Sequence, residues 1–164
     1  MKKETNTGLT VLELLITLAI IAIVATTAPN FFSWTKRYGY KNTYHHLEQT
    51  LSSLRSEALS QNTSTRLVVE NNGNAYTLHS YVTPTPVSSC DSSGGWTDLS
   101  SEALSIPSSF QVTGDGVSGV CFYRDGSASG GTFNITQKNG GTDIGSATIT
   151  VIVATGYLDV TASQ

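Results

Sequence analysis

The chain has 164 residues, the length of about one domain. Charged residues make up only 13% of it, against roughly 25% in typical soluble domains, and the formal net charge is −3. This balance provides no strong positive field and therefore argues against a partner that is recruited by charge alone, such as a nucleic acid. Residues 29–164 are numerous enough to bury a modest core.

Residues 9–28 form an apolar run that contains a single acid, Glu13. About 20 apolar residues suffice to span a bilayer, but a carboxylate inside such a helix is costly and usually has a function. A short polar leader, residues 1–8, precedes the run, carries Lys2 and Lys3 and ends at Gly8. The pattern predicts a transmembrane or assembly helix over residues 9–28.

Three interpretations of this start remain open. An ordinary secretory signal has no acid near the head of its apolar region, and a plain membrane anchor leaves Glu13 unexplained. In the third, Gly8 ends a cleaved leader and Leu9 starts the mature chain. Gly8 would let a protease approach the backbone, and Glu13 would neutralise the free amine of a neighbouring subunit. We favour the third.

Residues 8–16, Gly-Leu-Thr-Val-Leu-Glu-Leu-Leu-Ile, resemble the start of type IV pilins and type II secretion pseudopilins. The resemblance implies cleavage between Gly8 and Leu9 by a prepilin peptidase, N-methylation of Leu9, and an assembly charge pair at Glu13. Leu9 departs from the usual phenylalanine, and we still expect processing. A leader that stays inside predicts a single pass through the inner membrane with a periplasmic C-terminal domain, followed by entry into a fibre.

Residues 29–62 read as an amphipathic helix. Its apolar positions are spaced by three and four residues, which predicts one stripe packed on a sheet. The stripe consists of Tyr40, Tyr44, Leu47, Leu51, Leu54 and Ala58. The adjacent His45 and His46 point about 100° apart and are interpreted as exposed.

Within this helix, the segment that holds Arg55, Ser56 and Glu57 resembles the Leu-x-Arg-Ser-Glu-Ala segment of GspH/FimT-like minor pilins and minor pseudopilins. A generic helix with an exposed arginine and an exposed glutamate is the alternative interpretation.

Residues 63–164 read as a β-rich globular domain, so the expected fold class is α+β, a long N-terminal helix packed on an antiparallel sheet in the manner of type IV pilins. The hairpin turn at residues 71–74 is the strongest local signal, and residues 83–109 read as a long loop. The predicted strands are 65–70, 75–82, 110–113, 117–123, 132–137, 147–154 and 157–161. Cys90 and Cys121 are either free buried thiols or, in an exported domain, the disulfide that we expect.

The C-terminal half resembles the same family at Phe122-x-x-Asp125-Gly126, at Gly130-Gly131-Thr132 and at Thr155-Gly156. Family members implicated in DNA uptake carry Gly-Arg-x-Arg at the last turn. Here residues 156–159 are Gly-Tyr-Leu-Asp, which argues against DNA binding by that turn. A DNA surface that combines Arg124 with Lys138 is left open.

No catalytic constellation, metal motif or cofactor motif stands out, so we expect a structural protein and not an enzyme. We expect a minor pilin that helps to initiate or cap a type IV pilus. The alternatives are a minor pseudopilin of type II secretion, a tip-displayed DNA-binding pilin and a plain anchored periplasmic domain. The expected partners are other pilins or pseudopilins, the prepilin peptidase and, before assembly, the inner membrane.

Overall fold

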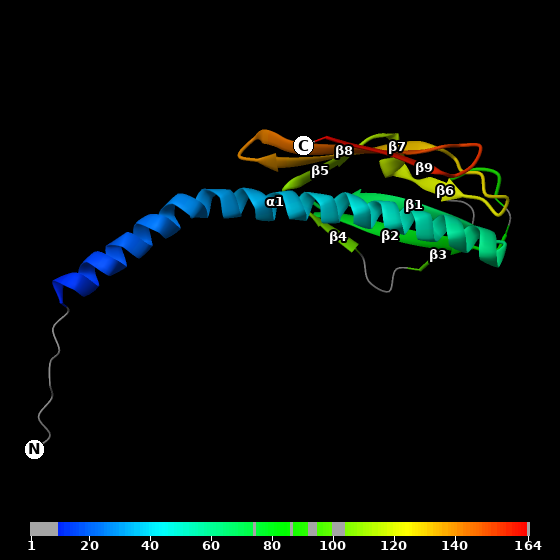
Figure 1. The fold of residues 1–164 in the computed structure, drawn as a ribbon. Helices are drawn as coiled ribbons and strands as arrows, with labels where there is room; N and C mark the ends of the chain where they lie inside the picture. The colour runs from blue at the N-terminus through cyan, green and yellow to red at the C-terminus, as the bar shows by residue number, and fades with distance from the viewer. Residues whose placement is uncertain (1–9, 74, 86, 92–94, 100–103, 164) are drawn as a thin grey trace, which may run out of the picture. The chain divides into compact units, whose positions relative to one another are not determined.

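The structure, a computed structural model, describes residues 10–73, 75–85, 87–91, 95–99 and 104–163, without the side chains of residues 27–38, 104, 105 and 139. The chain divides into two units, residues 1–39 and 40–164. One helix, α1 (Val11–Gln61), begins in the first unit and ends in the second (Figure 1).

Within the described residues, no helix is long and apolar enough to cross a membrane. The predicted span over residues 9–28 includes Leu9, which lies outside the described residues, and so do the side chains of residues 27 and 28. The prepilin leader, residues 1–8, also lies outside them. A membrane-spanning role for this segment therefore stays a prediction.

The second half of α1 carries the predicted apolar stripe. All six stripe residues, Tyr40 to Ala58, are at most 8% exposed, which confirms the helical period that the sequence indicated. The helix ends where Asn62 adopts a positive φ of 53° and the N–H of Thr63 donates to the carbonyl of Ala58 at 3.1 Å. This is the Schellman type of helix end, and asparagine is one of the few residues other than glycine that adopt it readily.

Two antiparallel sheets pack with this half of α1, where the sequence suggested one β-sheet domain. The first has the strand order β3-β2-β1-β6, and β4 also pairs with β2. Its strands are β1 (Ser64–Asn71), β2 (Ala75–Thr83), β3 (Thr97–Asp98), β4 (Leu104–Pro107) and β6 (Val120–Phe122). The predicted hairpin is confirmed by the full β1–β2 register from Ser64↔Thr83 to Asn71↔Tyr76.

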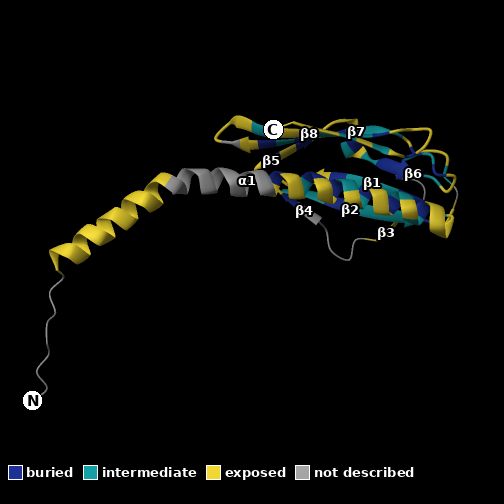
Figure 2. Cartoon of the chain, in the orientation of Figure 1, coloured by how far each residue is buried: buried dark blue, intermediate teal, exposed yellow. Residues whose placement is uncertain are grey.

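The second sheet has the order β5-β7-β8-β9. Its strands are β5 (Phe110–Thr113), β7 (Gly131–Asn139), β8 (Thr142–Val151) and β9 (Leu158–Ser163). The hydrophobic core contains side chains from α1 and from both sheets, including Leu51, Leu67, Phe133 and Ile149, all 0% exposed. Figure 2 marks where buried residues lie along α1 and the strands.

The prediction of residues 83–109 as a loop with little regular structure was wrong in part. β3 and β4 lie inside this segment and both add to β2, with Ile106 of β4 buried opposite Tyr76. The predicted strand over residues 117–123 was also too long. Its first part belongs to a short 3-10 helix, Asp115–Ser118, and Gly119 with a φ of 143° separates that helix from β6.

Candidate functional site

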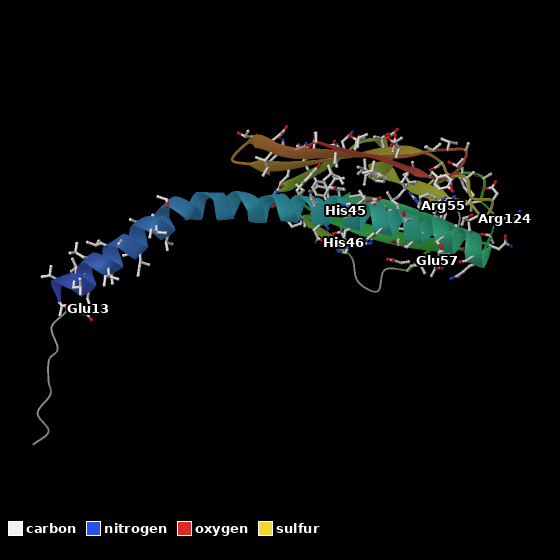
Figure 3. All side chains as sticks on the ribbon, viewed as in Figure 1. Glu13, His45, His46, Arg55, Glu57 and Arg124 are labelled. Atoms are coloured by element: carbon white, nitrogen blue, oxygen red, sulfur yellow. A yellow bond between two sulfur atoms is a disulfide. The ribbon has the colours of Figure 1, made fainter. Side chains whose placement is uncertain are left out.

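The N-terminal end of α1 is closed by a reciprocal pair, Thr10 and Glu13. The backbone N–H and the hydroxyl of Thr10 donate to Oε2 of Glu13 at 3.0 and 3.2 Å, and the N–H of Glu13 donates back to the Thr10 hydroxyl at 3.3 Å. This is a capping box, in which the first residue before the helix and the third residue inside it satisfy each other's backbone groups. Glu13, labelled at the start of α1 in Figure 3, therefore already has a local role in a single copy of the chain.

The apolar first part of α1, on both sides of Glu13 in the sequence, is exposed (Figure 2). Ten large apolar side chains between Val11 and Val24 are each at least 50% exposed. Full burial of a fully exposed side chain of this size contributes about 1.5–3 kcal/mol, and these ten are on average about 60% exposed, so covering them would be worth roughly 9–18 kcal/mol. A contiguous exposed surface of this kind marks an interaction site with protein or lipid.

In the globular unit, Arg55 ties α1 to the turn between β8 and β9. Its Nε–H donates to the carbonyl of Thr155 at 3.1 Å, and its guanidinium lies 4.3 Å from the centroid of the Tyr157 ring. A bond to a carbonyl 100 residues away, together with a stack on an aromatic ring, uses both the planarity and the charge of arginine. The generic interpretation of Arg55 as a merely exposed arginine was wrong.

Gly156 allows this close approach. Its φ is +61°, and a Cβ at this position would lie 2.7 Å from the carbonyl oxygen of Gly126 and 3.2 Å from Nε of Arg55. The N–H of Gly156 donates to the carbonyl of Ile152 at 2.7 Å, which closes the turn. The resemblance at residues 155–156 thus corresponds to a tight turn that the helix holds in place.

Arg124 and Lys138 lie at different ends of the α1 stripe. Arg124 lies in the turn that contains Gly126, and Gly126 approaches Leu59 in the last turn of α1. Lys138 follows Gln137, which is paired with Gly145 of β8. Gly145 in turn packs beside the ring of Tyr40, about 28 Å along the helix from Leu59. The structure therefore does not combine these two cations into one patch, although Arg55 and Arg124 do lie at the same end (Figure 3).

The turn that holds Arg124 is stabilised locally. The carboxylate of Asp125 accepts hydrogen bonds from the hydroxyl and the N–H of Ser127 at 2.6 and 3.0 Å, and these bonds lower its pKa. A shallow cavity of about 270 Å³ adjoins this turn and is lined in part by Ser88, Tyr123 and Arg124.

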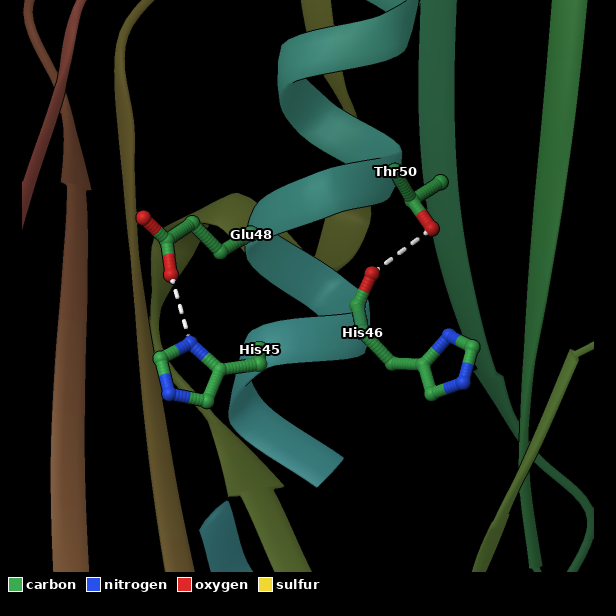
Figure 4. A network of polar contacts seen from close by, with 4 residues as sticks. All are labelled: His45, His46, Glu48 and Thr50. Carbon is green, nitrogen blue, oxygen red and sulfur yellow. Dashed lines mark hydrogen bonds and ion pairs between the residues drawn. The ribbon is translucent and has the colours of Figure 1, made fainter. Parts of the chain in front are cut away.

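His45 and His46 are exposed, as expected, and they make separate contacts (Figure 4). Nδ1 of His45 lies 3.0 Å from Oε2 of Glu48, while the carbonyl of His46 accepts a bond from the hydroxyl of Thr50. Within the part of the chain that the structure describes, no group of three His, Cys, Asp or Glu side chains could hold a metal ion. The histidines therefore do not combine into a ligand site.

The other predicted residues have structural roles. Cys90 and Cys121 form the expected disulfide, which joins the loop after β2 to β6 across 31 positions. Glu57 accepts a bond from Gln61 one turn later, and Ser56 is exposed. Gly8 and Leu9, the predicted sites of cleavage and methylation, lie outside the described residues.

Two groups that take part in these contacts were not identified from the sequence. Thr10 was detectable, because Thr-x-x-Glu ahead of an apolar run is the sequence signature of a capping box. The carbonyl of Thr155 was not detectable from the sequence, because a backbone group that accepts a hydrogen bond from a side chain 100 residues away leaves no local pattern.

A helix with an exposed apolar first part and a buried second part that packs on antiparallel sheets defines a pilin-like subunit. Residues 44–156 match the family model described as type II transport protein GspH, and because this match covers more than half of the chain, the protein belongs to that family. No curated protein sequence matches the chain.

Solved structures show the same fold at low sequence identity. The chain is similar to the minor pseudopilin EpsH from the type 2 secretion system of Vibrio cholerae, with 15% identity, a TM-score of 0.54, and coverage of 74% of this chain and 95% of that one. It is also similar to the type IV minor pilin FimU of Pseudomonas aeruginosa in a P21 crystal form, with 16% identity, a TM-score of 0.52, and coverage of 80% and 97%.

Proposed function

We propose that this protein is a minor subunit of a pilin-type fibre, a minor pilin that helps to initiate or cap a type IV pilus. The exposed apolar surface from Val11 to Val24 is the observation that carries the proposal, because none of the residues that the structure describes covers it. In a fibre, the same segments of neighbouring subunits would cover one another. Before assembly, the inner membrane would shield the segment.

The chemistry at Glu13 supports the same role. After cleavage behind Gly8, the new amine would lie one residue before Thr10, the cap of α1. A charged amine in an apolar fibre core needs an opposite charge. Glu13 of one subunit would supply that charge to the amine of its neighbour, while its capping contact with Thr10 would fix the position of the carboxylate.

A minor pseudopilin of a type II secretion system is the second candidate. The description of the matching family, a type II transport protein, favours it. The Arg55 contact to the last turn is consistent with either fibre, because it acts inside the globular unit. Identification of the subunits that co-purify with the full chain from its native host would distinguish a pilus from a pseudopilus.

Three variants test the assembly role of Glu13. Glu13→Gln can still accept the capping bonds but has no charge, Glu13→Ala loses both, and Thr10→Val loses the hydroxyl but keeps the charge. We expect Glu13→Gln and Glu13→Ala to be cleaved but absent from sheared fibres, and Thr10→Val to be incorporated in reduced amount. Glu48→Gln, a half-buried helix acid farther along α1 whose carboxylate contacts His45, is the control and should assemble normally.

The proposal fails if Glu13→Gln enters fibres as efficiently as the unaltered protein, since the carboxylate would then act as a cap alone. It also fails if mass spectrometry of the chain from cells with prepilin peptidase shows Met1 as the N-terminus.

A further inference from the structure

The shallow cavity beside the turn at residues 123–127 brings together side chains from three separate segments. Ser64 belongs to the start of β1, Val87 and Ser88 to the loop after β2, and Arg124 to the turn after β6. The volume of about 270 Å³ lies at the lower limit of small-molecule sites, which measure roughly 300–1,000 Å³. The cavity therefore suits one small unit of a ligand.

The walls of this cavity are held in place in the free protein. The disulfide between Cys90 and Cys121 ties the loop after β2 to β6, so it joins two of the three lining segments. Two backbone bonds of 2.9 Å close the turn, from the N–H of Gly126 to the carbonyl of Tyr123 and from the N–H of Tyr123 to the carbonyl of Ser127. A preformed site loses less conformational freedom on binding.

The lining carries no net charge. Arg124 and Asp125 contribute one positive and one negative charge, and the other five lining residues are uncharged. Asp125 stays ionised at neutral pH, because the hydrogen bonds from Ser127 lower its pKa. An anion would be attracted by Arg124 and repelled by Asp125, and a cation the reverse, so this pair of charges favours an uncharged ligand.

The lining offers hydrogen-bond donors and acceptors side by side. The guanidinium of Arg124 supplies donors only, and among the described residues it makes no ion pair. Both bonds from Ser127 go to Oδ1 of Asp125, so Oδ2 can accept a bond from a ligand. The Tyr123 hydroxyl can do both, because burial and then the charge of Asp125 raise its pKa and it keeps its proton.

Apolar groups adjoin these polar ones. Val87 lines the cavity, and Leu59, 43% exposed, approaches Gly126 in the same turn. Gly126 also lies against Gly156, whose neighbour Tyr157 is 61% exposed. Arg124 and this apolar rim share one end of the globular unit (Figure 3). A ring with hydroxyls on its edge and C–H groups on its faces matches this combination, and a sugar is such a ring.

We propose that this cavity binds a single uncharged monosaccharide unit of a glycan, whose hydroxyls bond to Arg124, Asp125 and Tyr123. A peptide is a poorer match, because peptides bind along open strand edges or extended grooves. All lining residues lie in the unit Tyr40–Gln164, so the site does not depend on fibre assembly. A small ligand in a shallow cavity binds weakly, with a Kd on the order of 1 mM.

Saturation-transfer NMR on the full chain, in a detergent without a sugar headgroup, detects binding in this range. The uncharged probes are the methyl glycosides of glucose, galactose, mannose and N-acetylglucosamine, and methyl glucuronide is the anionic probe. We expect at least one uncharged probe to bind, and to bind more tightly than methyl glucuronide. If none of the four uncharged probes binds the folded protein, or if methyl glucuronide binds more tightly than all of them, the proposal is overturned.

Four variants locate the binding. Arg124→Ala removes the donors and Ser88→Trp fills the cavity from an exposed position, and each should weaken binding about tenfold or more without lowering the melting temperature. Lys138→Ala, an exposed cation at the other end of the α1 stripe, is the matched control and should bind normally. Asp125→Asn leaves Arg124 as the only charge and should reverse the preference in favour of methyl glucuronide. Binding that survives both Arg124→Ala and Ser88→Trp, or an unchanged preference in folded Asp125→Asn, would also overturn the proposal.

Discussion

Replacement of Arg55 by lysine tests whether the helix holds the last turn. Arg55→Lys keeps the charge but removes the Nε–H that donates to Thr155 and the planar group over Tyr157. At a half-exposed site, the hydrogen bond contributes about 1–1.5 kcal/mol and the stack about 0.5–1 kcal/mol. The expected loss is therefore about 1.5–2.5 kcal/mol in the free energy of unfolding.

For the unit Tyr40–Gln164, each 1 kcal/mol corresponds to roughly 4 °C in melting temperature. Arg55→Lys should therefore melt about 6–10 °C below the unaltered protein, measured by circular dichroism on the full chain in detergent. Tyr157→Leu should lower the melting temperature by about 2–4 °C, and the double variant should lose less than the sum, because the two residues share the stack. Arg124→Lys, an exposed arginine at the same end, should change stability by less than about 0.5 kcal/mol. An Arg55→Lys melt within about 2 °C of the unaltered protein would refute the reasoning.

Two other predictions concern the globular unit. Cys90→Ser removes the disulfide that closes a loop of 31 positions and should lower the free energy of unfolding by about 3–4 kcal/mol. In a thermal melt, the variant should match the unaltered protein after reduction. Equal melting temperatures of the variant and the unaltered protein under oxidising conditions would contradict this prediction. Tyr40 has a buried hydroxyl without a hydrogen-bond partner in the described residues, and burial raises its pKa to about 12. Because the unfolded chain ionises at a pH near 10 and the folded chain does not, stability should fall from pH 10 to 12, by up to about 2–3 kcal/mol. In denaturant titrations, Tyr40→Phe should lose less stability over this pH range than the unaltered protein, and the remaining loss includes that from Tyr123, whose pKa is also raised by burial. Tyr157→Phe should keep the full loss.

The regular elements could be predicted wherever their stability is local. The α1 stripe and the β1–β2 hairpin follow from a period of 3.6 residues and from the turn at residues 71–74, so sequence and structure agree there. β4 could not be predicted, because its strand conformation depends on pairing with β2, and Pro107 at its end reads as a loop residue. The division into two sheets depends on which strands pair, and no local pattern encodes that choice.

The contacts of the candidate site could likewise be predicted only where they are local in the sequence. The Thr10–Glu13 cap lies within one turn and has a sequence signature, whereas the contact of Arg55 with Thr155 joins residues that are distant along the chain. The resemblance in the Arg55 segment identified the correct residue without its partner. Only the fold shows that this arginine and the turn at Gly156 are one structural unit.

The way in which α1 is fastened determines how the domain would respond to mechanical load. Near its start, the buried half of the helix packs Tyr40 against Gly145 of β8. Farther along, the hydroxyl of Thr65 in β1 donates a hydrogen bond to the carbonyl of Leu54, and Arg55 donates one to the carbonyl of Thr155 in the turn after β8. A pull along the helix axis would therefore strain both sheets together, and the contacts would have to yield in shear, many at once. Such a domain resists extraction of its helix better than one whose contacts separate one after another.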